Sequence, residues 1–546
     1  MNMGFRAAAG ALAAAFVTIS QAAFADDAAR QGETLYNGIR LPAEWPPRVR
    51  TLTREPMSPP YLASPPKVIP IDVGRQLFVD DFLIEKTDLK RTWHRARWHE
   101  VNPVLKPDKP WEMTAPSPTA MVFSDGVWYD PADKRFKMWY MGGYVKSTCY
   151  ATSEDGIRWV KPALKAVEAG TNIVHRRHRD SAAVWLDLGA KDPKKRYKLF
   201  VVCTEDRAWR VFVHYSADGI DWGRPVAVSG PVGDRTTVFH NPFRGKWVYS
   251  IRCGAAGMGR ARRYREHADA AEGARWDAGG VVPWIGADRN DPPRADLKTT
   301  PQLYNLDAVA YESVMLGLFT IWPGQPSDRA KPNYVCLGFS RDGFHWHRGD
   351  HRPFIGPSEQ QGDWNWGNVQ SAGGGCLIVG ENLHFYVSAR AGIKGSRTSG
   401  VCSTGLAVLR RDGFASMDAG AAPAALTTRP VRFGGRHLFV NADTDGGEIR
   451  AELLDEAGKP VAPFTRDACA PIRADGTRQW VRWKGAADLS AVAGRTVRFR
   501  FHLRKASLYA FWVSPDATGA SGGYVAAGGP GLAGPTDTVG AAGPKR

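Results

Sequence analysis

Three near-copies of one short motif, Ser-x-Asp-Gly-x-x-Trp, recur in the first two-thirds of this chain. They span Ser153–Trp159, Ser216–Trp222 and Ser340–Trp346. Their aspartates lie 63 and 124 residues apart, and the second interval is close to twice the first. One further copy is therefore expected to have lost its motif, near Ala274–Trp276. A fixed repeat of this length, built from strands and turns, predicts a β-propeller with one sheet per repeat.

Between the motifs, the sequence alternates predicted strands with Asp-Pro and Asp-Gly turns. Counting these units gives five blades, whose innermost strands are expected near residues 114–124, 180–187, 234–241, 307–319 and 368–379. After Arg410, residues 448–454 and 497–504 alternate apolar and polar positions with a period of two, which indicates strands with one buried face. The predicted fold is all-β: a five-bladed β-propeller followed by a C-terminal β-sandwich.

The ends of the chain differ in composition from its centre. An arginine near the start, an apolar stretch over residues 7–19 and the small residues at 23–25 are typical of a cleaved signal peptide, so we expect a secreted or periplasmic protein. No other stretch is long and apolar enough to span a membrane. The predicted boundaries are a signal peptide at 1–25, a Pro-rich extension at 26–75, the propeller at 76–410, the sandwich at 411–515 and a disordered Gly/Ala/Pro tail at 516–546.

Charge and cysteine content exclude some classes of function. The 72 Lys and Arg against 55 Asp and Glu give a net charge of +17 over 546 residues. Such a charge attracts acidic partners, but no long Lys/Arg run marks a nucleic-acid-binding arm, so scattered surface arginines are the favoured explanation. The seven cysteines form no Cys-x-x-Cys pair and predict buried strand residues rather than a zinc or redox centre. Their pairing and the oligomeric state stay open.

The repeated motif is expected to be structural. It resembles the Asp-box of sialidases, in which a carboxylate ties a β-turn and a Trp packs under the blade, although one residue fewer separates Asp from Gly here. Hydrogen bonds from Asp155, Asp218 and Asp342 to the turn backbone would account for these residues fully.

Catalytic candidates come from the start of the predicted inner strands. Hydrolysis of a glycosidic bond needs two carboxyl groups on opposite sides of the scissile bond. Five acidic residues qualify: Glu112, Asp180, Asp234, Asp307 and Glu312. Asp180 and Glu312 are favoured because they interrupt apolar strands, where an acid is costly to bury. The alternative for each is an ion pair with a neighbouring arginine, such as Arg179 or Arg235.

Asp307 and Glu312 are five residues apart, so a regular strand would turn them to opposite faces. At most one of them is then expected to point toward the propeller axis.

The five-blade count, the secretion signal, the triplet Arg179-Asp180-Ser181 and the trailing sandwich resemble glycoside hydrolase families 32, 43 and 68. The resemblance implies a nucleophile or base on the first blade, a stabilising Asp on the second and an acid Glu further along. Asp180 matches the stabilising Asp, with Ser181 in place of the usual Pro. The first blade has no Asn-Asp-Pro motif and offers only Glu112, and Glu312 falls on the fourth blade, later than in these families. The chain is thus identified as a divergent relative.

Candidate substrate-binding residues open the fifth inner strand. A Trp face stacks on a sugar ring and amides bind its hydroxyls, whereas the alternative for each Trp is core packing. Gly373–Gly375 would permit close approach at the axis. The binding candidates are Trp364, Asn365, Trp366, Asn368, Gln370, Arg179, Arg235 and Tyr311, and Arg235, Arg252 and Arg390 are candidates for binding an acidic sugar. We expect no metal site and no cofactor, apart from a possible structural cation in the central channel.

The sequence therefore predicts a secreted glycoside hydrolase with a carbohydrate substrate and no nucleic-acid or membrane partner. Glu312 would be the general acid, Asp234 or Glu112 the base or nucleophile, and Asp180 would orient the substrate. One alternative is a non-catalytic carbohydrate-binding propeller, which the missing first-blade motif favours. The other is a sialidase, for which Tyr311-Glu312 is the nearest match to a Tyr-Glu nucleophile pair.

Overall fold

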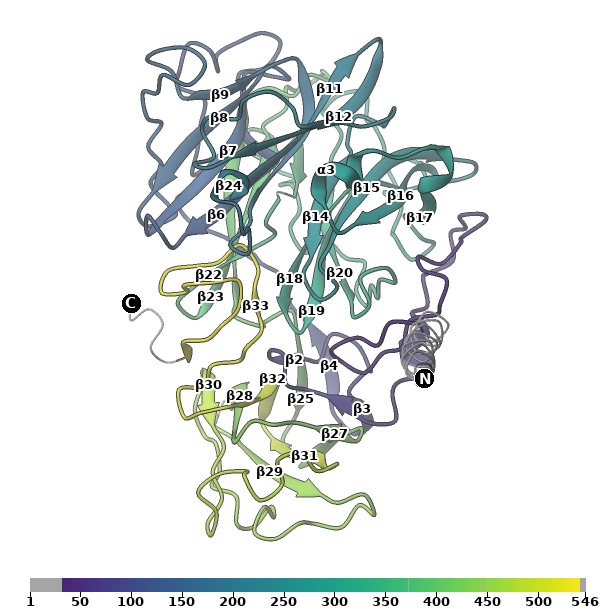
Figure 1. Cartoon of the computed structure of the whole chain (residues 1–546), viewed down its shortest axis with the longest axis vertical. Helices are drawn as coiled ribbons and strands as arrows, with labels where there is room; N and C mark the ends of the chain where they lie inside the picture. Colours follow the sequence, from purple (N-terminus) through teal and green to yellow (C-terminus); the bar gives the residue numbers. More distant parts are fainter. Residues whose placement is uncertain (1–31, 372, 445, 541–546) are drawn as a thin grey trace, which may run out of the picture.

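The computed structural model describes residues 32–371, 373–444 and 446–540, and the predicted signal peptide lies outside the described residues. This part of the chain is nearly all-β, with short helices α2 (Pro60–Ala63) and α3 (Ala270–Ala274). No helix among the described residues is long and apolar enough to cross a membrane. Figure 1 shows two stacked groups of sheets, an upper group from the centre of the chain and a lower group from its C-terminal part.

Five antiparallel sheets follow one another along the upper part of the molecule. They are β6 (Ala120–Asp130), β7 (Arg135–Gly142), β8 (Ser147–Ser153) and β9 (Ile173–Arg176); β10 (Arg179–Leu186), β11 (Tyr197–Glu205), β12 (Ala208–Ser216) and β13 (Ala227–Val228); β14 (Thr237–Asn241), β15 (Lys246–Ala255), β16 (Gly259–His267) and β17 (Val282–Gly286); β18 (Gln302–Glu312), β19 (Val314–Trp322) and β20 (Tyr334–Ser340); and β21 (Asn368–Gln370), β22 (Leu377–Val379), β23 (Asn382–Arg390) and β24 (Cys402–Arg410).

These sheets lie next to one another in chain order, and the first strands of the first four are neighbours. β6 contacts β10, β10 contacts β14, β14 contacts β18, β20 contacts β21, and β23 returns to β6. The sheets therefore make a closed cycle of contacts. Each predicted inner strand overlaps the first strand of one sheet.

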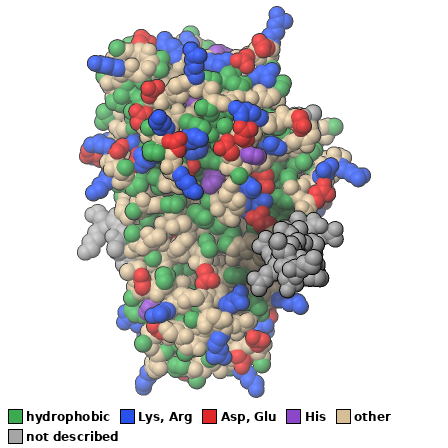
Figure 2. All heavy atoms as spheres, viewed as in Figure 1, with side chains coloured by type: hydrophobic (Ala, Val, Ile, Leu, Met, Phe, Trp, Pro, Cys, Tyr) green, Lys and Arg blue, Asp and Glu red, His purple; other side chains and the backbone are tan. Residues whose placement is uncertain are grey.

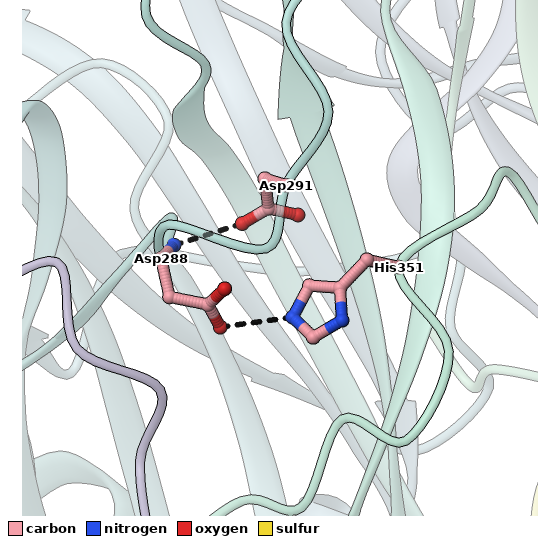
Figure 3. Close-up of side chains that lie close together, drawn as sticks. All are labelled: Asp288, Asp291 and His351. Atoms are coloured by element: carbon pink, nitrogen blue, oxygen red, sulfur yellow. Dashed lines mark hydrogen bonds and ion pairs between the residues drawn. The ribbon is translucent and has the colours of Figure 1, made fainter.

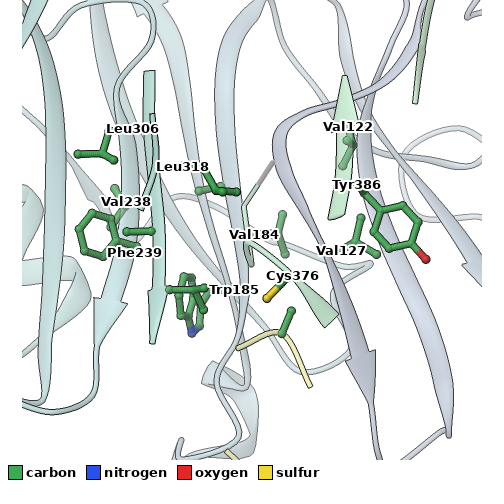
Figure 4. Packing of buried hydrophobic residues seen from close by; sticks show 14 of the residues in the cluster. Val122, Val127, Val184, Trp185, Val238, Phe239, Leu306, Leu318, Cys376 and Tyr386 are labelled. Carbon is green, nitrogen blue, oxygen red and sulfur yellow. The ribbon is translucent and has the colours of Figure 1, made fainter. Parts of the chain in front are cut away.

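An apolar core is shared by several sheets of the cycle. Figure 4 shows Val122, Val184, Val238 and Leu306, from four successive first strands, packed in one cluster. Burial of this apolar surface is the main force that holds the sheets together. All seven cysteines are free and six of them are buried, in agreement with the prediction that they act as small core residues.

Asp-Pro turns close two of the hairpins in the same way. Asp130 Oδ1 accepts a hydrogen bond from the N–H of Ala132 (3.0 Å), and Asp192 Oδ1 accepts one from the N–H of Lys194 (3.0 Å). Proline fixes the backbone after each aspartate, which favours the turn. These local signals explain why the hairpins were predictable from the sequence.

The repeated motif forms one kind of turn after the third strand of sheets one, two and four. Asp155 Oδ1 accepts hydrogen bonds from the backbone N–H groups of Ile157 and Arg158, both at 2.8 Å. Asp218 and Asp342 make the same pair of bonds to the residues two and three positions on. The predicted structural role of the three aspartates is confirmed.

An aromatic donor from the preceding sheet in the cycle closes each of these turns. The ring group donates a hydrogen bond to a backbone carbonyl oxygen within the motif. The pairs are Tyr386 Oη to Gly156 (2.5 Å), Trp139 Nε1 to Gly219 (2.7 Å) and Trp284 Nε1 to Phe344 (2.8 Å). The motif thus fastens neighbouring sheets as well as its own turn.

Replacing Gly219 with alanine should therefore destabilise the protein by about 2–5 kcal/mol. Its φ of +79° is left-handed, and a Cβ atom there would lie 2.5 Å from Trp139 Cζ2, so backbone strain adds to overpacking. Gly170 is the matched control, because its φ is +82° but a Cβ atom there would have no other atom within 4 Å. Gly170→Ala should cost about 1–2 kcal/mol. Urea unfolding of both variants checks this, and equal losses would contradict the proposed fastening.

The lower part consists of two sheets that face a common apolar core. One contains β30 (Gly476–Trp480), β28 (His437–Asp443), β32 (Ala506–Ser514), β25 (Ala415–Ala419) and β4 (Lys90–Trp93), with β2 (Gln76–Leu77) paired to β32; the other contains β29 (Glu448–Leu454), β31 (Arg498–Arg504), β26 (Ala424–Thr428) and β3 (Ile84–Thr87). Phe433, Phe499, Phe501 and Phe511 belong to the core cluster of these sheets.

Residues 76–93 were predicted to begin the propeller, and this is wrong. β2, β3 and β4, the purple strands of Figure 1, pair with strands of the lower sheets instead. The next strand, β5 (Arg97–Trp98), joins the fifth upper sheet through β24. An apolar pattern reveals a strand but not its partner, which here is more than 300 residues away in the sequence.

The predicted disorder of residues 516–546 is also wrong as far as residue 540, and residues 541–546 lie outside the described part. β33 (Tyr524–Val525) pairs with the end of β18, and Ser521 Oγ donates a hydrogen bond to Glu312. Glycine is needed here for close approach, since a Cβ atom on Gly523 would lie 2.1 Å from Glu312 Oε2. The small residues that suggested disorder thus serve packing.

Positive charge is dispersed over the surface. Figure 2 shows Lys and Arg side chains spread over the upper and lower parts of the visible face, interspersed with Asp and Glu. On this face, the view agrees with scattered surface arginines as the source of the high net charge.

Candidate functional site

Asp180 lies at the start of β10 with one carboxylate oxygen unengaged. Its side chain is 18% exposed, and Arg235 Nη1 approaches Oδ1 only to 3.8 Å. Oδ1 accepts no hydrogen bond from any described residue. Burial raises the pKa of Asp180 to about 6; Arg235 opposes this rise and the nearby Asp234 adds to it. Asp180 is therefore an acid that keeps its proton to a higher pH than an ordinary aspartate, up to about pH 6.

Asp234 is held beside Asp180 by the backbone of its own loop. Ser181 Oγ donates to the carbonyl oxygens of Asp234 (2.9 Å) and Thr236 (2.6 Å), which fixes this loop against β10. The Asp234 side chain is 39% exposed and lies 3.5 Å from Arg252 Nε. An acid on β10 and an acid in the loop before β14 are thus brought together, and both reach solvent.

Arg235 connects this pair to Asp307 at the centre of the cycle. Arg235 Nη2 donates to Ser124 Oγ (2.9 Å), and Ser124 Oγ in turn donates to Asp307 Oδ2 (3.2 Å). Asp307 Oδ2 also accepts from Asn305 (2.7 Å) and Ser371 (2.6 Å). Burial raises the pKa of Asp307, which these bonds oppose. Asp307 is 4% exposed, so it is placed to position Arg235 and Ser124 rather than to meet a ligand.

Asp125 is a carboxylate that the sequence analysis missed. It forms a two-point ion pair with Arg179, with Nη2 at 2.7 Å from Oδ2, and both side chains are fully buried. The first predicted inner strand ended at residue 124, whereas β6 continues to Asp130 through an irregular register between Met121 and Gly126. Extending that strand by one residue would have revealed an acid on the first sheet. Arg179, a predicted binding residue, is occupied by this pair.

Glu112 is buried within the first sheet and its oxygens are engaged. Tyr140 Oη donates to Oε1 (2.6 Å), while Lys161 Nζ (2.7 Å) and the backbone N–H of Asp108 (2.9 Å) contact Oε2. A carboxylate with these partners and no exposed surface anchors the segment before β6. The structure does not place it with Asp180 and Asp234.

Glu312 was predicted to be the general acid, and the structure places it elsewhere. It lies at the far end of β18, eight residues from Tyr304, which corresponds to about 26 Å along the strand. Tyr304 lies on the side of Asp180, because Lys331 donates a hydrogen bond to Tyr304 and the charge of Lys331 acts on Asp180. Glu312 is fully buried and pairs with Arg411 (3.0 Å) and Arg75 (3.5 Å). Its neighbour Tyr311 donates a hydrogen bond to Asp412 (2.6 Å). Neither residue serves the site at Asp180, so the predicted roles of both are corrected.

Three of the predicted binding residues, Trp364, Asn365 and Trp366, lie in the segment before β21. Trp364 packs edge-on against Trp98 (5.2 Å between ring centroids), which indicates a packing role, and Asn365 is buried. Trp366 is 7% exposed and lies 5.1 Å from the Arg329 guanidinium.

The two amides on β21 form a short buried chain. Asn368 donates to the carbonyl oxygen of Lys331 (2.7 Å), and Gln370 donates to Asn368 Oδ1 (2.7 Å). Gln370 Oε1 and both amide atoms of Asn333 have no hydrogen-bond partner among the described residues. Buried polar atoms of this kind require a partner, which water or a polar ligand can supply.

The glycines after β21 behave as predicted. A Cβ atom on Gly373 would lie 2.8 Å from the carbonyl oxygen of Ser124, and one on Gly375 would lie 2.6 Å from Val309 Cγ1. Only glycine permits the backbone to come this close to β6 and β18.

A separate cluster of Asp288, Asp291 and His351 has the residue types of a metal site (Figure 3). Asp291, however, forms a two-point ion pair with Arg348, with Nη1 at 2.8 Å from Oδ2. His351 Nε2 lies 3.0 Å from Asp288 Oδ2. The guanidinium already supplies the positive charge that a metal ion would bring, so this cluster is an ion-pair network that fits no cation.

This chain is similar to several proteins whose structures have been solved. No family model matches the sequence, and no curated protein matches it. An N-acetylgalactosamine deacetylase from F. plautii in complex with blood group B trisaccharide is 13% identical, with 63% of this chain and 97% of that chain covered and a TM-score of 0.37.

Two glycoside hydrolases are similar to the same extent. A glycosyl hydrolase from Bacteroides ovatus is 13% identical over 58% of this chain and 94% of its own, with a TM-score of 0.39. A thermostable family-43 glycoside hydrolase is 9% identical over 56% and 96%, with a TM-score of 0.40. All three TM-scores are below 0.5, a level at which similarity does not indicate function.

Proposed function

We propose that this chain is a secreted or periplasmic glycoside hydrolase that cleaves a glycan at the site of Asp180 and Asp234. In this proposal the five upper sheets are the blades of a propeller, the two lower sheets form a β-sandwich, and the start of the first strands is the catalytic end. The observation that carries the proposal is the pair itself: a partly exposed carboxyl group with a raised pKa and an unengaged oxygen lies beside a second, more exposed carboxylate.

The two environments suggest a division of labour. Asp180, with its raised pKa, would donate a proton to the glycosidic oxygen as the bond to the anomeric carbon breaks. Asp234 would act on the opposite side, either as a base that takes a proton from the attacking water or as a nucleophile at the anomeric carbon. Arg235, held by Ser124, would fix the position of Asp180.

A screen for product release tests this function directly. Purified protein is incubated with a panel of plant, algal and microbial glycans, and new reducing ends are measured. Cleavage of at least one glycan that is lost in Asp180→Asn supports the proposal. Binding without any release of reducing ends throughout the panel would instead favour the second candidate below.

The pH dependence of cleavage should follow the protonation of Asp180. A general acid works only while it carries its proton, and the protonated fraction falls above a pKa of about 6. We therefore expect kcat/KM to decrease about tenfold per pH unit well above pH 6. Initial rates at low substrate concentration between pH 4 and 9 provide the measurement. A rate that rises throughout this range would exclude Asp180 as the acid.

One observation favours a non-catalytic carbohydrate-binding propeller as the second candidate. Asp125, the acid that β6 brings to the first sheet, is neutralised by its two-point pair with Arg179 and has no exposed surface. Together with Glu112, which is also engaged, this leaves the first sheet without a free carboxylate among the acids considered. A sugar-binding protein would need none.

A further inference from the structure

Several cations gather near Asp180 without enough acids to balance them. Tyr304, at the start of β18, is flanked by three of them: Lys331 Nζ lies 4.7 Å, the Arg260 guanidinium 5.5 Å and the Arg235 guanidinium 5.7 Å from the ring centroid. We call these three residues together with Arg262 and Arg390 the cation cluster. They come from the third, fourth and fifth sheets or from the loops that join them.

Ion pairing within the cation cluster is scarce. Among the described residues, the one ion pair that any of its five members forms is the loose contact between Arg235 and Asp180 at 3.8 Å. Arg262 instead donates to the carbonyl oxygens of Arg235 and Tyr304. Burial, assisted by the charge of Arg235, lowers the pKa of Arg262 to about 9. Like charges are thus held together in a setting that disfavours them.

Arg390 is an enclosed member that has hydrogen-bonding capacity left. It is 4% exposed, donates to Ser399 Oγ (3.0 Å) and contacts Tyr144 Oη at 3.5 Å. Its Nε has no hydrogen-bond partner among the described residues. Its guanidinium carbon lies 5.7 Å from the centroid of the Phe123 ring, against which Arg235 packs at 3.7 Å, so Arg390 lies beside Arg235 at this site.

Lys331 is an accessible member. It is half-buried, and its Nζ donates to Tyr304 Oη (2.8 Å), an arrangement that leaves two of its three donors free of any described partner. Its charge also acts on Asp180. Lys331 and Arg390 thus lie beside the rings of Tyr304 and Phe123, the two rings that Arg235 also contacts, and one of these two cations is accessible while the other is enclosed.

From these contacts we propose that the site binds glycans whose sugar units carry an anionic group, a carboxylate or a sulfate ester, and that Lys331 and Arg390 contact that group. Charge-assisted bonds from Lys and Arg are the usual means of holding such anions. A bound anion would also relieve the repulsion within the cation cluster. This inference rests on the proposed function only in placing the glycan at Asp180.

The test compares binding of matched acidic and neutral glycans. Asp180→Asn is used as the host protein, so that turnover does not disturb the measurement. The probes are oligogalacturonates and their full methyl esters for the carboxylate, and sulfated galactan oligosaccharides that contain no uronic acid, with their desulfated forms, for the sulfate. Isothermal titration is performed at low and high salt, because screening weakens an ionic contact.

At least one acidic probe should bind tenfold or more tightly than its neutral partner, and the difference should shrink at high salt. Lys331→Gln and Arg390→Gln should each remove most of this difference and leave neutral binding within twofold. Arg473→Gln, on the exposed surface of the lower sheets, is the charge-matched control and should change neither. Because Lys331 is half-buried, Lys331→Gln should fold, and it tests the proposal even if Arg390→Gln does not fold.

The outcomes separate this inference from the proposed function. An acidic preference without cleavage by the unmodified protein supports the inference and overturns the hydrolase. Cleavage of a neutral glycan, with no acidic probe bound better than its neutral form, overturns the inference and keeps the hydrolase. Absence of any acidic preference across both probe pairs likewise overturns the inference.

Discussion

Asp180→Asn should reduce glycan cleavage by about 10²–10⁴-fold while the protein stays folded. Loss of a general acid typically has an effect of this size. Asparagine has nearly the same shape as aspartate, so the contact with Arg235 and the packing at the start of β10 are retained. What is lost is the proton that the raised pKa of Asp180 keeps available near pH 6.

The comparison requires a control aspartate and a second readout. Asp218 is suitable, because it holds a turn through its bonds to Ile220 and Asp221 and lies outside the site. Asp218→Asn should lower stability and leave kcat/KM within about twofold. In Asp180→Asn the residual activity should also lose its decline above pH 6. A variant that keeps more than half of the activity, or keeps that decline, would remove Asp180 from the mechanism.

The sequence analysis succeeded where the signal is local. The motif turns, the Asp-Pro hairpins and the first strands of the sheets are set by residues a few positions apart. Asp180 and Asp234 were found because one lies at the start of β10 and the other just before β14, and these successive first strands lie side by side. Arg235 and Arg390 were candidates because an arginine can bind the carboxylate or sulfate of an acidic sugar.

The failures concern contacts between distant parts of the chain. Glu312 and Asp180 look alike in sequence, as each is an acid in an apolar strand. The difference lies in their partners: Glu312 contacts Arg75, 237 residues away, and Arg411, 99 residues away. Lys331 was missed because it lies in a loop between β19 and β20, where no periodic pattern marks it. Burial cost alone therefore does not distinguish a catalytic acid from a structural one.

The same network makes Glu312 the residue whose loss should most affect stability. It joins three segments: Arg75 before β2, Arg411 after β24 and Ser521 in the C-terminal segment, whose hydroxyl donates to Oε2 (2.7 Å). Asp412 and Asp537 complete the network, and Arg75 pairs with Asp412 at 2.8 Å. The ion pairs therefore lie where the upper sheets, the lower sheets and the C-terminal segment meet.

Glu312→Gln should destabilise the protein by about 3–5 kcal/mol. The variant leaves the buried charges of Arg75 and Arg411 with one acceptor fewer, and breaking a buried pair by removing one partner has a cost of this order. Glu448→Gln is the control, because Glu448 forms ion pairs on the surface with Arg450 and Arg473 and should contribute less than about 1 kcal/mol. Urea unfolding gives both values, and proteolysis of residues 516–540 should accelerate only in Glu312→Gln.

The activity of Glu312→Gln decides whether Glu312 is a structural residue or the general acid. If Glu312 is structural, the folded fraction of Glu312→Gln at low temperature should cleave glycan with a kcat within about threefold of the unmodified protein. If instead cleavage disappears while unfolding shifts by less than 1 kcal/mol, the ion pairs with Arg75 and Arg411 do not explain the residue. Glu312, at the end of β18, would then be the candidate general acid, and Asp180 and Asp234 would no longer be the proposed catalytic pair.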